Sequence, residues 1–170
     1  FMVNGLLGGR TSLGSMFGVA TQYDEYHGAG LVGSVAVGDA GSSLSFTGFR
    51  SRSDPHERGV DRDDLYVRDR LTIGGAVPLR REDTSAVALN LMLDLDDLDI
   101  TRSGFELRDE RLRMLDAGST WTWQRGAKTQ SLASVDFVKG LNGLGSGLHA
   151  ADLIADPRRS DFALLRGTFV

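Results

Sequence analysis

The run Ser85-Ala86-Val87-Ala88-Leu89-Asn90-Leu91-Met92-Leu93-Asp94-Leu95-Asp96 decides the fold class, because an apolar residue occupies every odd position from 87 to 95. The even positions include Asn90, Asp94 and Asp96. A β-strand points alternate side chains to opposite faces, so this run has one apolar and one polar face. A helix would distribute the same aspartates around its circumference. The run therefore predicts a β-strand.

The same alternation recurs along most of the chain, which indicates an all-β fold. A less regular run covers residues 11–22. Together the runs predict about eight strands, and the longest of them exceed the roughly ten residues that a tilted strand needs to cross a bilayer. The clear alternating runs lie at residues 31–37, 44–47, 71–79, 85–96, 115–123 and 135–137.

The connections between these runs are alternately short and long. Short polar turns at 38–42, 80–84 and 125–128 each join two runs directly, which predicts hairpins. Longer polar segments lie at 52–64, 101–109 and 142–160. Short turns at one end and long loops at the other are typical of outer-membrane β-barrels.

The polar positions distinguish two classes of all-β protein. In a soluble sandwich the inner faces of the sheets form a dry core. Here one face of the strands carries Asp94, Asp96, Asp116 and Asp136 beside very small residues. This pattern fits an antiparallel transmembrane β-barrel, whose apolar face meets lipid and whose polar face meets a wet lumen.

This fold class makes a specific prediction for each face. We expect Trp121 and Trp123, close to a short turn, to lie in the aromatic girdle at the membrane interface. We expect Asn90, Asp94, Asp116 and Asp136 to face the lumen. The residues expected to face lipid are Leu71, Ile73, Val87, Leu89, Leu91, Leu93 and Val135.

Composition excludes several other classes. The chain has 170 residues, no cysteine, and 19 Lys and Arg against 23 Asp and Glu, a formal net charge of −4. A disulfide scaffold and a thiolate zinc site are therefore excluded, as is a strongly basic nucleic-acid surface. The chain begins at Phe1 and ends at Val170 inside an apolar run, so we expect residues 1–170 to be one partial barrel domain.

No residue constellation in the sequence indicates catalysis, a metal or a cofactor. Counted from Asp94, the acidic run has Asp99 and Phe105 where a calcium loop needs glycine and a bidentate glutamate. His27, His56 and His149 are isolated from one another and are expected at the surface. The glycine-rich segment 143–147 lacks the spacing of a phosphate loop. We therefore expect no enzyme activity and no cofactor.

Several motifs resemble one family of outer-membrane barrels. Glu110-Arg111-Leu112-Arg113-Met114-Leu115, with Gly118 following, is similar to a strand start in that family. Further similar segments are Val135-Asp136-Phe137-Val138-Lys139-Gly140-Leu141, Ala76-Val77-Pro78-Leu79-Arg80-Arg81, Ser43–Ser53, and Asp156-Pro157 with Asp161–Arg166. In this order and spacing, over roughly residues 29–170, they resemble the barrel region of TpsB-type two-partner secretion transporters, the haemolysin/haemagglutinin secretion-activation family.

The resemblance implies a sixteen-stranded barrel in the outer membrane of a Gram-negative bacterium, through which an unfolded partner exoprotein reaches the cell surface. The expected partners are this secreted exoprotein and outer-membrane lipid, and not nucleic acid. In the family, two POTRA domains precede the barrel; these domains and the second half of the barrel are absent from residues 1–170. The family's Val-Arg-Gly-aromatic motif is also absent, and Leu165-Arg166-Gly167-Thr168 is only superficially similar to it.

Two alternatives remain open from the sequence. One is another outer-membrane barrel, either an autotransporter translocator or an assembly factor. The other is a soluble β-sandwich binding module, in which a second sheet would cover the apolar face. A passenger domain fused upstream would favour the first alternative, and a chain that stays soluble and monomeric without detergent would favour the second.

Overall fold

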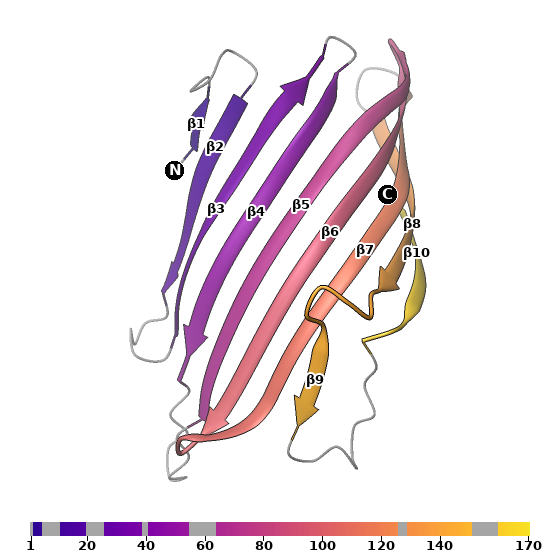
Figure 1. The fold of residues 1–170 in the computed structure, drawn as a ribbon. Coiled ribbons are helices and arrows are strands. Elements are labelled where there is room, and N and C mark those ends of the chain that lie inside the picture. Colours follow the sequence, from indigo (N-terminus) through magenta and orange to yellow (C-terminus); the bar gives the residue numbers. More distant parts are fainter. Residues whose placement is uncertain are drawn as a thin grey trace.

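The structure, a computed structural model, describes residues 2–4, 11–19, 26–38, 41–54, 64–125, 129–150 and 160–170. Every regular element in these residues is a β-strand, and together the strands form one sheet (Figure 1). This part of the chain contains no apolar helix long enough to span a membrane. The prediction of an all-β fold is confirmed.

The sheet follows chain order almost throughout. The path runs β1-β2-β3-β4-β5-β6-β7-β8-β10, every neighbouring pair is antiparallel, and β9 pairs with β7 beyond the end of β8. In the described residues β1 and β10 are not paired with each other, so the sheet is curved but open, not a closed barrel (Figure 1). The strands are β1 (Met2–Asn4), β2 (Thr11–Val19), β3 (Tyr26–Val37), β4 (Ser42–Ser53), β5 (Asp64–Glu82), β6 (Ser85–Arg102), β7 (Phe105–Arg125), β8 (Thr129–Gly140), β9 (Gly147–Ala150) and β10 (Ala163–Phe169).

The prediction of a long loop at residues 101–109 is wrong. Residues 101–109 contain a two-residue turn, because β6 continues to Arg102 and β7 begins at Phe105. Ser103 and Gly104 in the turn have φ values of 48° and 80°, which suits the tight hairpin turns that need positive φ at both central residues. The alternation stops near Asp96 because charged residues then occupy both faces, but the backbone pairing of the two strands continues.

The other two predicted long segments are only partly described. Residues 55–63, between β4 and β5, lie outside the described residues, and so do residues 151–159. The segment 142–160 also contains a strand that its sequence did not indicate, β9, which pairs with Arg108–Arg111 of β7. The end of the sheet that carries these connections is therefore more regular than the polar sequence predicts.

Close backbone approach explains one of the glycines of β3. A Cβ atom at Gly30 would lie 2.6 Å from the carbonyl oxygen of Gly48 and 2.9 Å from the ring of Phe49. We expect Gly30→Ala to lower the free energy of unfolding by about 1–3 kcal/mol, since a backbone atom must move. In Gly48→Ala the new methyl group would meet only Leu71, at 4.0 Å, so the change should stay within about 0.5 kcal/mol. Urea unfolding of the two variants measures the difference, and equal midpoints would contradict it.

Candidate functional site

The cross-strand register divides the side chains of the sheet into two sets. Residues directly opposite one another on paired strands share a face. One row, for example, joins Phe46, Ile73, Leu93 and Leu115 across β4, β5, β6 and β7. The apolar face defined in this way comprises Leu31, Val35, Leu44, Phe46, Leu71, Ile73, Val77, Val87, Leu89, Leu91, Leu93, Leu115, Trp121, Val135, Phe137 and Leu165.

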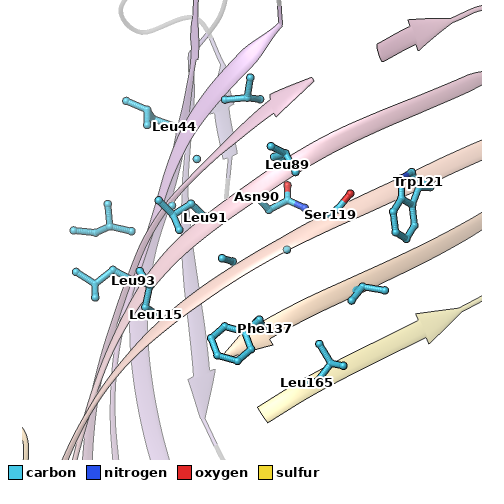
Figure 2. Close-up of a pocket in the computed structure, with 17 residues that line it drawn as sticks. Leu44, Leu89, Asn90, Leu91, Leu93, Leu115, Ser119, Trp121, Phe137 and Leu165 are labelled. Carbon is cyan, nitrogen blue, oxygen red and sulfur yellow. The ribbon is translucent and has the colours of Figure 1, made fainter. Parts of the chain in front are cut away.

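The apolar face is uncovered. Leu91, near its centre, is 55% exposed, and most of the other large side chains of this face are exposed as well. Figure 2 shows Leu44, Leu89, Leu91, Leu93 and Phe137 around one broad hollow of about 880 Å³. Apolar surface left in water costs about 25 cal/mol per Å², and monomeric soluble proteins rarely expose contiguous patches of this kind. This face therefore needs an apolar environment.

The opposite face, here called the polar face, is the more enclosed of the two. Asp116 is only 5% exposed, and Asp94 and Asp96 are also buried. By contrast, Val138 is the single buried hydrophobic residue of the described chain, at 8% exposed. The polar face comprises Thr47, Arg68, Arg70, Thr72, Asn90, Asp94, Asp96, Asp116, Thr120, Asp136 and Arg166. The sheet is thus inverted relative to a soluble protein, with its polar side chains inside and its apolar side chains outside.

Side chains of the polar face form a network across β5, β6 and β7. The Thr72 hydroxyl donates a hydrogen bond to Asp94, and the Arg70 guanidinium lies 3.5 Å from the same carboxylate. Asn90 Nδ2 donates to Thr120 Oγ1 at 2.9 Å. Arg68 Nε donates to Asp96 Oδ1 at 2.8 Å. Enclosed carboxylates need such partners, because an unpaired charge in a poorly hydrated site is costly.

A second part of the network lies on β7, β8 and β10. One guanidinium, that of Arg166, serves two carboxylates, with Arg166 Nη2 at 3.1 Å from Asp116 Oδ2 and Arg166 Nε at 3.6 Å from Asp136 Oδ2. Asp116 Oδ1 is buried and has no hydrogen-bond partner among the described residues. The three arginines Arg68, Arg70 and Arg166 thus face four aspartates in ion pairs, which leaves the face close to neutral.

The structure separates the sequence-predicted residues into their two expected groups. Leu71, Ile73, Val87, Leu89, Leu91, Leu93 and Val135 all lie on the apolar face, and Asn90, Asp94, Asp116 and Asp136 all lie on the polar face. Trp121 and Trp123 lie on the apolar side. The centroid of the Trp123 ring is 5.9 Å from the centroid of the Phe169 ring.

A row of charges that the sequence did not indicate ends the apolar face. Arg50, Asp69, Asp97 and Arg111 lie side by side on β4, β5, β6 and β7. On β6 the apolar positions from Val87 to Leu95 span about 27 Å along the strand at about 3.4 Å per residue. A tilt of about 40° reduces this to roughly 20 Å, close to the apolar band of an outer-membrane barrel. The aromatic side chains of Trp121 and Trp123 lie at the other end of the band.

Two like charges oppose each other just beyond this band. Asp99 on β6 pairs in register with Asp109 on β7. Partial burial of its carboxyl group and the charge of Asp109 raise the pKa of Asp99, and Arg111 partly offsets this effect. An acid with a raised pKa in the folded state binds its proton more tightly there than in the unfolded chain. Proton binding by Asp99 therefore stabilises the folded state at low pH. This stabilisation is lost as the pH rises through the pKa of Asp99 in the unfolded chain and then through its higher pKa in the folded protein.

We accordingly expect Asp99→Asn to stabilise the protein at pH 7 by a few tenths of a kcal/mol, the size of a like-charge cross-strand pair at an exposed site. At pH 3.5 the gain should disappear, because Asp99 is then largely protonated in the wild-type protein. Urea unfolding midpoints at the two pH values provide the measurement. A gain of equal size at both pH values would show that charge repulsion is not the cause.

The described residues contain no group of three or more His, Cys, Asp or Glu side chains placed to hold a metal ion. His27 lies in β3 and is half-buried. His149 lies in β9, and His56 lies outside the described residues. The histidines were predicted to be at the surface, and for His27 this prediction holds only in part.

Comparison of the chain with family models, with curated proteins and with solved structures gives no match. The class of protein is therefore defined by the fold and its two faces: an open antiparallel sheet with an exposed apolar face and an enclosed, charge-paired polar face.

Proposed function

We propose that this chain is part of a transmembrane β-barrel of a Gram-negative outer membrane that exports a partner exoprotein, as two-partner secretion transporters do. The observation that carries the proposal is the inversion of the two faces. Leu91 is exposed in the middle of an apolar band, whereas Asp94 and Asp116 on the opposite face are buried and paired with arginines. A lipid environment outside and a wet lumen inside stabilise this arrangement.

The polar face also suits the passage of an unfolded chain. Its carboxylates are already paired with Arg68, Arg70 and Arg166, so they present little net charge to a passing segment. Small side chains, such as Ala86, Ala88 and Gly118, occupy further positions of this face and leave room. Threading a polypeptide through such a pore makes and breaks no covalent bond, so the proposal needs no catalytic residue.

Export is tested in the native bacterium by deleting the complete gene. We expect at least one large protein to disappear from the culture supernatant and to return when the full reading frame is supplied on a plasmid. Quantitative mass spectrometry of the supernatants provides the measurement. Unchanged supernatants, with this protein found in the outer membrane, would retain a barrel but reject export.

Membrane location is tested separately with single cysteines, since the chain contains none of its own. We expect a water-soluble maleimide to label Asn90→Cys and to leave Leu91→Cys unlabelled in intact outer membranes. After addition of denaturant both positions should react equally, which controls for expression. A protein that remains soluble and monomeric without detergent would instead favour the β-sandwich module.

A further inference from the structure

A groove lies on the apolar face where its side chains give way to the row of charges. It has a volume of about 710 Å³ and extends from β2 to β7. Gly48 forms part of its floor, and a Cβ atom there would have only the Leu71 side chain nearby, at 4.0 Å. The volume is within the range of sites that hold small ligands.

One end of the groove is lined by bulky apolar side chains. Phe17, Leu31, Phe46 and Leu71 contribute to it and are all exposed. An acyl chain placed between them would remove apolar surface from water on both partners. The smaller residues Ala29 and Gly48 between these side chains provide the depth.

The other end of the groove is polar and carries both signs of charge. The Arg50 side chain is 73% exposed and only loosely paired, with Nε 3.6 Å from Asp69 Oδ1. Asp69 and Asp97 both line the groove and remain accessible. Arg113, in contrast, is 8% exposed and donates to Asp97 and to the Leu144 carbonyl oxygen, so it is already engaged.

This distribution of charge disfavours a lipid headgroup that carries negative charge alone. An accessible guanidinium binds a phosphate group well. Asp97 already accepts a hydrogen bond from Arg113, so Asp69, which is only loosely paired with Arg50, is the carboxylate with most need of a donor. Both carboxylates repel a ligand that offers only negative charge. A phosphorylated sugar headgroup supplies a phosphate for Arg50 together with hydroxyl and amide donors for Asp69 and Asp97.

We propose that this groove binds a phosphorylated glycolipid, with an acyl chain between Phe46 and Leu71 and the headgroup on Arg50, Asp69 and Asp97. The proposal rests on the membrane location proposed above. The groove lies toward the end of the sheet that carries the connection between β4 and β5. In outer-membrane barrels the longer connections face the cell exterior, so the ligand would belong to the outer leaflet.

The test uses the protein from its full reading frame, purified in detergent and exchanged against bis-phosphorylated lipid A, phosphatidylglycerol or phosphatidylethanolamine. Native mass spectrometry measures retention of each lipid. We expect lipid A to be retained over the two phospholipids. Arg50→Gln should reduce its retention about tenfold or more, and Gly48→Leu, which fills the groove, should reduce it similarly.

The matched control is Arg102→Gln, which removes an arginine paired with Asp64 outside the groove. It should retain lipid A like the wild-type protein. Equal losses in Arg50→Gln and Arg102→Gln would overturn the proposal, as would equal retention of all three lipids. A barrel that exports its partner but retains no lipid A would reject only the groove, whereas a detergent-free soluble monomer would reject the membrane location itself.

Discussion

Leu91→Arg is expected to reduce the free energy of folding into lipid vesicles by about 2–4 kcal/mol, the cost of arginine on the lipid face near the bilayer midplane. Leu91 lies midway between Val87 and Leu95, the two ends of the apolar positions on β6. Its side chain is exposed, so in a bilayer the introduced guanidinium would meet hydrocarbon and not other protein groups. Folding titrations in urea with vesicles of a single phospholipid provide the measurement.

The matched control changes the adjacent residue. In Asn90→Arg the new side chain lies on the polar face, where the cross-strand partners Ala76 and Gly118 are small and leave space. Asp136, which pairs with Gly118, is the next residue across the sheet. The variant loses the hydrogen bond from Asn90 to Thr120, so we expect a cost below about 1.5 kcal/mol. If arginine were tolerated equally at both positions, the assignment of the two faces would be wrong.

This comparison alone does not separate a barrel from a sandwich, because Leu91 would be buried in either. The two tryptophans make the distinction. Trp121 and Trp123 are the only tryptophans of the chain and both lie on the apolar side of β7. In vesicles, lipids brominated on the acyl chain should quench their fluorescence strongly. A second protein sheet over this face would shield them.

The sequence predicts the faces of this sheet well because a strand has a period of two. In β6, the alternation from Val87 to Asp96 assigns each side chain to its face without reference to any partner strand. A shift in register by two residues would leave this assignment intact. The prediction for Leu91 and Asn90 therefore depends only on local pattern, and the structure places the two residues on opposite faces of the sheet.

The ends of the long strands could not be predicted by the same method. In Asp96–Arg102 and Phe105–Arg113 charged residues occupy both faces, so no alternation marks a strand. These segments stay paired through their backbones and through ion pairs such as Arg113 with Asp97. A pairing between two strands is not visible in the sequence of either one.

The charge network was missed for a related reason. Asp116 and Asp136 were recognised as polar-face residues, but their partner Arg166 is separated from Asp116 by 50 positions in the chain. Its position follows from the pairing of β10 with β8, which brings Arg166 directly opposite Asp136. The sequence showed the aspartates of this face, and only the register shows which arginines pair with them.

Arg166→Ala is expected to destabilise the protein by about 1–3 kcal/mol, since it leaves two enclosed carboxylates without their cation. The Arg166 side chain is itself half exposed, and this solvent access keeps the cost below that of breaking a fully buried pair. Unfolding in urea at pH 7 measures the loss.

A double-mutant cycle separates this electrostatic effect from the loss of packing. If Arg166 acts by neutralising the pair, Asp116→Asn should cost less in the Arg166→Ala background than in the wild-type protein, and the two changes should be non-additive. Asp96→Asn is the control, because Asp96 has its own partner in Arg68. Its effect should add independently to that of Arg166→Ala. Additivity at both aspartates would mean that Arg166 stabilises β10 through contacts other than its ion pairs.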